Sequence, residues 1–253
     1  MIKLKFCLMT FVLSFLMLPY YTFANECDEF EIVSENTKYY KTISIINNNL
    51  YLLKSNIKYN SFEITEEEYN RIENNSTIVL SNYSGITETT YKKMTTTIST
   101  NGNYYRYKIV LNWKNMPATG SYDIIGIGFL GSVKVRSSLN FTQEYCRNSG
   151  GCITSTTNYP QTFNYGAGTT FKLPTDSIYS LKQTLYFDVE KNTSSTVVLQ
   201  EAYGDYSHAT SNISLANAKK YSVVSNVGIS LNSSVTSYYD SINVSEAGWE
   251  GVW

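Results

Sequence analysis

The chain contains a single histidine, His208, so any chemistry that needs an imidazole depends on this position. It lies in the stretch EAYGDYSHAT, beside Asp205 and Ser207. The members of a catalytic triad meet in space, and residues this close in sequence rarely adopt that geometry. We therefore expect His208 to be a hydrogen-bonded residue of a loop or strand end, and the sequence predicts no catalytic residue.

Carboxylates offer a second kind of chemistry, because a glycosidase needs only two of them at a set separation. The acids available for such a pair are Asp123, Asp176, Glu201, Asp205 and Asp240. Scattered acids in this number are ordinary for a chain of 253 residues. The chain has no Gly-x-Ser-x-Gly elbow, phosphate-binding loop or calcium loop. A secreted carboxylate-dependent hydrolase is therefore the alternative to a non-catalytic function.

The stretch EYCRNSGGCIT places Cys146 and Cys152 around a short polar loop whose two glycines favour a tight turn. A metal site needs about four ligands from Cys, His and carboxylates, and a reactive thiol needs a neighbouring base. The sequence offers neither, so we predict no metal and no cofactor. Nearby cysteines of exported proteins form disulfides. The pair is predicted to be a structural disulfide, and Cys27 is left without a predicted partner.

The first residues have the pattern of a secretory signal peptide. Lys3 and Lys5 form a positive region, residues 6–18 are almost entirely apolar, and cleavage is expected between Ala24 and Asn25. The apolar run is shorter than the roughly 20 residues that a transmembrane helix needs. We expect a secreted protein, extracellular or associated with the cell surface, with residues 1–24 removed and no integral membrane segment left.

The mature chain is close to neutral. Loss of two lysines with the signal leaves 18 basic residues against 21 acids, a net charge of −3. This balance does not favour nucleic acid as a partner. The 23 tyrosines and the low share of charged residues, 16%, are typical of a β-rich exported protein.

Alternation of apolar and polar residues is the main evidence for fold class. The clearest stretches are residues 105–113, 133–142, 181–191 and 223–235, each with one apolar and one polar side. Such strands form antiparallel sheets that bury one face. The expected fold is all-β, an antiparallel β-sandwich-like domain over residues 86–253.

Residues 25–85 are expected to form a smaller N-terminal segment packed on that domain. A hairpin is predicted at residues 43–53, with its turn at Asn47 to Asn49. Thr65 and Glu68 have the spacing of a capping box ahead of a short helix.

Aromatic residues near predicted loops and strand ends are the candidates for a ligand-binding site, because their flat apolar faces and polar tips suit sugars and protein surfaces. The candidates are Tyr203, Tyr206 and Trp249. Tyrosine also fills ordinary strand positions, so a structural role stays open. The Ser- and Thr-rich stretches 193–200 and 222–237 have the alternation of membrane hairpins, which makes a β-type pore-forming protein the third function class.

Three stretches, residues 64–72, 111–129 and 202–240, resemble exported β-rich proteins of low-GC Gram-positive bacteria to which no function is assigned. The similarity covers roughly residues 60–240. It implies export and carries no site residues over to this chain.

Together these patterns predict a secreted non-catalytic protein that associates with a surface or binds a ligand through loops on a rigid β framework. The expected partner is a cell-wall polymer, a glycan or a surface protein.

Overall fold

A computed structural model describes residues 30–47, 56–72, 86–116, 119–240 and 243–253. These residues form antiparallel sheets packed together, with little helix, and the all-β sandwich-like prediction is confirmed. The predicted signal peptide, its cleavage site at Ala24 and Asn25, and Cys27 lie outside the described residues.

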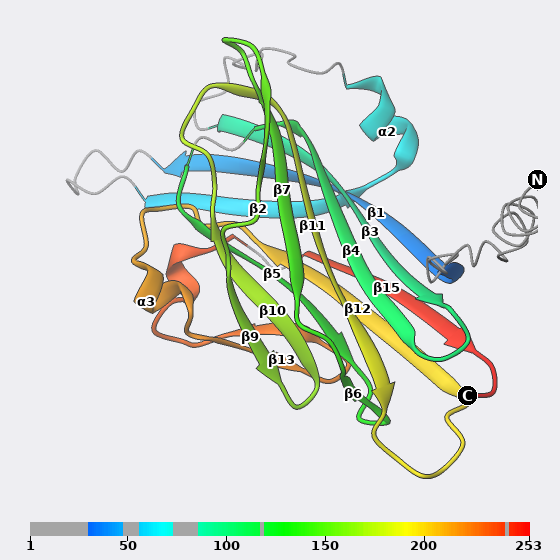
Figure 1. The fold of residues 1–253 in the computed structure, drawn as a ribbon. Helices are drawn as coiled ribbons and strands as arrows, with labels where there is room; N and C mark the ends of the chain where they lie inside the picture. Colours follow the sequence, from blue (N-terminus) through cyan, green and yellow to red (C-terminus); the bar gives the residue numbers. More distant parts are fainter. Residues whose placement is uncertain (1–29, 48–55, 73–85, 117–118, 241–242) are drawn as a thin grey trace, which may run out of the picture.

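The larger sheet joins strands from both ends of the chain. In the described ranges it has eight strands, ordered β2 (Asn56–Ile64), β1 (Glu31–Asn47), β3 (Ile86–Thr100), β4 (Tyr105–Asn115), β11 (Ile178–Lys191), β7 (Asn140–Arg147) and β8 (Cys152–Ser155), with β6 (Val133–Val135) also paired to β11. Figure 1 shows β4, β11 and β7 side by side along the length of the molecule. On β4 and β11 buried and partly exposed residues alternate strictly, as the sequence pattern predicts.

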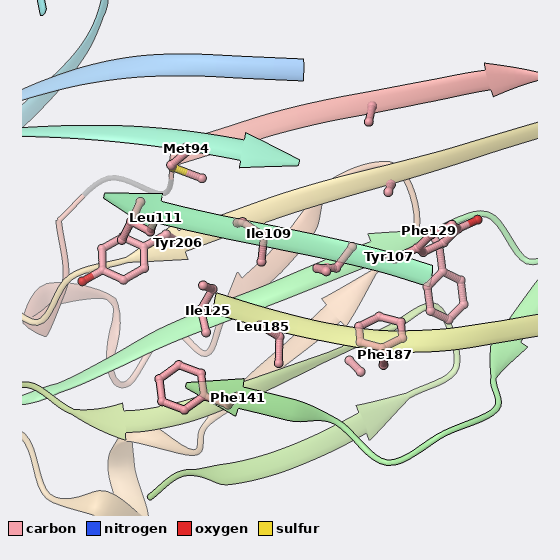
Figure 2. Close-up of a cluster of buried hydrophobic side chains, with 14 of the residues drawn as sticks. Met94, Tyr107, Ile109, Leu111, Ile125, Phe129, Phe141, Leu185, Phe187 and Tyr206 are labelled. Atoms are coloured by element: carbon pink, nitrogen blue, oxygen red, sulfur yellow. The ribbon is translucent and has the colours of Figure 1, made fainter. Parts of the chain in front are cut away.

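The smaller sheet packs against the apolar side of the larger one. Its order is β15 (Asn243–Glu250), β12 (Leu199–Ser207), β5 (Tyr122–Phe129), β10 (Gly166–Lys172) and β9 (Tyr159–Phe163). The main core lies between the sheets (Figure 2), with Tyr107, Phe129 and Phe187 clustered at one end. Burial of these rings is the main stabilising contribution at this interface.

A third layer covers the other side of the smaller sheet. It comprises α3 (Leu215–Ala218), β13 (Tyr221–Val224), β14 (Gly228–Leu231) and the short 3-10 helix η1 (Thr236–Tyr238), which enclose a second core with Ile124 of β5. The layer sits very close to β5, because a Cβ on Gly126 would lie 3.1 Å from the Ile229 side chain.

The prediction of one continuous strand over residues 223–235 is wrong. Asn226 and Gly228 have positive φ angles of 64° and 83°, so the chain reverses there and makes a two-stranded hairpin. Ile229 is consequently buried, whereas Val227 at the turn is 56% exposed.

Residues 133–142 also form two strands instead of one. Between β6 and β7, Ser137 leaves the strand pattern, and its Oγ accepts a hydrogen bond of 2.9 Å from the Asp188 backbone N–H. Both strands still pair with β11.

The N-terminal strands extend the larger sheet. β1 pairs with β3 along nearly its whole length, and β2 pairs with the second half of β1. The prediction of a turn at Asn47 to Asn49 is wrong, because Asn47 still belongs to β1 and pairs with Asn56 of β2. Residues 48–55 between them lie outside the described ranges. The helix α2 (Glu66–Arg71) begins as expected, with Thr65 Oγ1 accepting a hydrogen bond of 3.1 Å from the Glu68 N–H.

The predicted disulfide is confirmed. Cys146 on β7 lies directly opposite Cys152 on β8, and the two sulfurs are bonded at 1.98 Å. Gly150 and Gly151 of the intervening turn have φ angles of 96° and 84°, which residues with a side chain rarely adopt.

Replacing Cys146 and Cys152 together by serine is expected to lower the free energy of unfolding by about 2 kcal/mol, since the bond closes only a short loop. Denaturant unfolding with and without a reducing agent measures this. The wild type should lose stability on reduction, and the double variant should not respond. Equal stability of oxidised wild type and variant would contradict the expectation.

Candidate functional site

The side of the larger sheet that faces away from the smaller sheet, here called the outer face, carries polar side chains across five neighbouring strands. On β4 and β11 the even-numbered residues point to this side, opposite the buried odd-numbered ones. On β3 the side chain of Thr96 points to the smaller sheet, where its Oγ1 donates to the Ser245 carbonyl oxygen at 2.8 Å. Its neighbours Thr95 and Thr97 therefore point to the outer face, and so do Thr37 and Glu35, which lie opposite them on β1.

The strand registers place these residues in three straight rows across β1, β3, β4, β11 and β7. The rows are Glu35–Thr97–Lys108–Tyr186–Asn140, Thr37–Thr95–Val110–Thr184–Thr142 and Tyr39–Lys93–Asn112–Lys182–Glu144. Residues directly opposite on neighbouring strands have Cβ atoms about 5 Å apart. Apart from Val110, the three rows are thus a regular array of polar side chains, of which Thr97 is only 1% exposed.

Within the three rows, charge is ordered by strand; outside them, Asp188 of β11 pairs with Arg106 of β4 at 2.8 Å. Lys93, Lys108 and Lys182 lie on the middle strands, whereas the two acids of the rows lie on the flanking strands β1 and β7. Lys182 Nζ is 3.6 Å from Glu144, and Lys93 Nζ lies 5.8 Å from the centre of the Tyr39 ring. The centre of the face is therefore positive, with a carboxylate at either side.

The helix α2 covers one end of the outer face. Its Tyr69 ring packs on Tyr39 at 5.0 Å between ring centres. Lys114 Nζ donates to the backbone oxygens of Tyr69 and Ile72, at 2.6 and 2.9 Å. These contacts hold α2 beside the rows and leave the side chains of the Thr95 row partly exposed.

A second group of polar residues lies inside the protein, and we call it the buried polar cluster: Lys92, Asp123, Tyr206, His208 and Asp240. His208 Nδ1 is 3.0 Å from Asp123 Oδ2, and Asp123 also accepts hydrogen bonds from the Tyr206 hydroxyl and, at 2.8 Å, from the Ala209 N–H. Lys92 Nζ is 3.3 Å from Asp240 Oδ2. β3, β5 and β12 bring these groups together from distant parts of the sequence.

Burial and charge act in opposite directions on His208. Desolvation alone would lower its pKa, but the carboxylates of Asp123 and Asp240 favour the imidazolium, and its pKa is raised above the ordinary value. Burial, together with the charge of Asp123, raises the pKa of Tyr206 well above its usual range. The tyrosine therefore stays protonated and donates to Asp123.

The cluster has an Asp–His pair, but its placement does not suit hydrolysis. The carboxylate partner of His208 is Asp123, 85 residues away, and the Ser207 hydroxyl points to the Asp240 carbonyl oxygen at 3.5 Å. Asp123 has no exposed surface, and His208 is 6% exposed. A substrate therefore has no route to the pair in this conformation.

The other acids proposed for a carboxylate pair are separated from the cluster. Asp205 faces the third layer, where its Oδ2 accepts a hydrogen bond of 2.5 Å from the Ile229 N–H, and burial raises its pKa well above the usual range. Glu201 accepts from the Tyr203 hydroxyl. Asp176 lines a surface cavity of about 200 Å³ and is paired with Arg147 at 2.7 Å.

The aromatic candidates do not form a joint surface site. Tyr206 is fully buried, which corrects its placement at a binding surface, and Tyr203 is only 8% exposed. Trp249 on β15 is partly buried and packs on Tyr105 at 5.3 Å between ring centres. Trp249 is partly buried because β15 pairs with β12 at the edge of the smaller sheet, where the Trp249 ring packs against the main core.

One residue and one surface important to these sites were not predicted from the sequence: Lys92 and the outer face. Lys92 alternates in phase with Met94 and Ile98, which was a signal that its side chain points inward. The outer face could be recognised only through registers between strands, which a single sequence does not contain.

Within the described ranges, no helix is both long and apolar enough to cross a membrane, and no three His, Cys, Asp or Glu residues come together as metal ligands. In comparisons with known proteins, no family model matches the chain and no curated protein is significantly similar to it.

Proposed function

We propose that the protein is exported and acts outside the cell as a non-catalytic binding protein, with the outer face as its contact surface. The observation that carries this proposal is the set of three in-register rows, in which lysines occupy the middle strands among hydroxyl and amide groups. Amines pair with anionic groups, and hydroxyls and amides exchange hydrogen bonds with the hydroxyls of a polymer. The proposed partner is an anionic cell-wall polymer or glycan.

The shape of the surface supports an extended partner. The rows cross five strands spaced about 4.8 Å apart, so each row offers a line of contacts roughly 20 Å long. An extended line of contacts suits a polymer better than a small ligand, which proteins usually hold in a concave pocket. The burial of the Asp123–His208 pair favours this binding role over the alternative of a hydrolase.

The test is co-sedimentation of the purified protein with isolated Gram-positive cell wall. Replacing Lys93 and Lys108 together by glutamine is expected to weaken binding about tenfold, since two charge contacts of somewhat under 1 kcal/mol each are lost. Binding by the wild type should also fall as salt is added.

The matched control replaces Lys172 and Lys220, two exposed lysines away from the outer face, by glutamine. It removes the same charge and should bind like the wild type. Equal weakening by both double variants would mean that net charge alone drives adsorption. A wild type that fails to sediment would remove the binding proposal and return attention to hydrolase and pore-forming functions.

A further inference from the structure

Lys92 is an unusual residue to find completely inside a protein. Its side chain has no exposed surface, and the side chain of Asp240, the acid beside it, is 1% exposed. An ion pair removed from water in this way pays a desolvation cost that the attraction between the charges often does not recover. A contribution of the ion pair to stability is therefore not enough to explain why Lys92 and Asp240 are buried together.

The lysine amine is confined by two aromatic rings. Nζ lies 5.2 Å from the centre of the Trp113 ring and 5.0 Å from that of Tyr206. The rings exclude water and leave the amine facing Asp240 Oδ2 at 3.3 Å. The nitrogen thus contacts the carboxyl group whose Cγ is the atom that it would attack to form an amide.

The carboxyl group of Asp240 is also oriented. Its second oxygen, Oδ1, accepts a hydrogen bond of 2.8 Å from the His208 backbone N–H. A fixed N–H donor at a carbonyl oxygen stabilises the negative charge that develops there when a nucleophile adds to the carbon. One oxygen is therefore placed to carry developing charge, and the other, near the amine, is placed to leave.

We propose that Lys92 and Asp240 form an intramolecular isopeptide bond, joining Nζ of the lysine to Cγ of the aspartate with loss of one water molecule. The bond would join two residues 148 positions apart. It would tie β3 of the larger sheet to the segment that leads into β15 of the smaller sheet. This covalent link across the sandwich is independent of what the outer face binds.

The reaction balances without a further reagent. The ammonium group first passes a proton to the carboxylate, which gives a neutral amine and a carboxylic acid. The nitrogen lone pair then forms the N–C bond, the C–O bond to the protonated oxygen breaks, and a second proton from nitrogen leaves with that oxygen as water. The buried carboxylate of Asp123 is the base that the same cluster offers for this second transfer.

The full chain, purified from a host that exports it, provides the test by mass spectrometry under reducing and denaturing conditions. We expect the intact protein to be lighter by the mass of one water than the sequence left after removal of the signal peptide, and a protease digest to contain a branched peptide joining Lys92 to Asp240. Lys92→Arg keeps the charge but should abolish the loss, as should Asp240→Ala. Lys93→Arg, a change of the neighbouring lysine, which is partly exposed on the outer face, should retain it.

Direct detection of the branched peptide keeps the test decisive even where a variant fails to fold. Linear peptides containing unmodified Lys92 and Asp240 in the folded wild type would overturn the proposal, as would a water loss mapped to other residues. Asp123→Asn, checked for folding by circular dichroism, is expected to reduce the linked fraction at least tenfold. If the fraction of linked protein were unchanged in Asp123→Asn, Asp123 would not be the base in the reaction, although the bond itself would still be established.

Discussion

Relative to protein in which the Lys92–Asp240 bond has not formed, replacing Asp240 by alanine is expected to lower the free energy of unfolding by about 3–5 kcal/mol, because the substitution leaves the Lys92 ammonium buried without a partner. The side chain of Lys92 has no exposed surface through which water could reach it. The His208 backbone N–H loses its acceptor as well. Domains of this kind are stable by only about 5–15 kcal/mol, so the variant should unfold at a much lower denaturant concentration.

Two further variants isolate the cause. Asp176→Ala breaks an ion pair with Arg147 at the surface, where the two side chains are 45% and 39% exposed, and should cost less than about 1 kcal/mol. Lys92→Met combined with Asp240→Ala leaves no buried charge unpaired and should be more stable than Asp240→Ala alone. A double variant as unstable as the single one would show that the unpaired charge is not the source of the loss.

The second large effect is expected in the main core. Replacing Phe187 by alanine should lower the free energy of unfolding by about 3–5 kcal/mol, since it removes a completely buried ring and leaves a cavity between the sheets. The ring packs against Phe129 and Tyr107, with centres 6.2 and 6.4 Å away. These neighbours belong to opposite sheets, so neither can close the cavity without moving a strand.

The matched control for this prediction is Phe62→Ala on β2. The Phe62 side chain is 50% exposed, and its removal should change stability by less than about 1 kcal/mol. Chemical denaturation of both variants measures the difference. Similar losses of stability in Phe187→Ala and Phe62→Ala would contradict the placement of Phe187 in the core and of Phe62 at the surface.

Alternation in the sequence was sufficient for the fold class and for the facing of single strands. Every second residue of β4 from Tyr105 to Trp113 is apolar, and so is every second residue of β11 from Leu181 to Val189 except Gln183. Burying one face of a pleated strand requires that period. The disulfide and the helix cap could also be predicted from the sequence, because each depends on residues only three to six positions apart.

Prediction failed where a turn interrupts an alternating stretch. Residues 223–235 keep the pattern of a single strand, yet Asn226 and Gly228 adopt positive φ angles and reverse the chain. The two halves of the hairpin then bury the same face against β5. A period of two does not distinguish one long strand from two short strands joined by a turn.

The candidate sites were decided by tertiary structure. Residues close together along the chain were sufficient to predict an export signal pattern, strands with one apolar face, and a local disulfide. Only the pairing of strands set Lys93, Lys108 and Thr95 into one lattice. Only the packing of two sheets brought Lys92 to Asp240, since contacts between residues 148 positions apart depend on how the whole chain closes on its core.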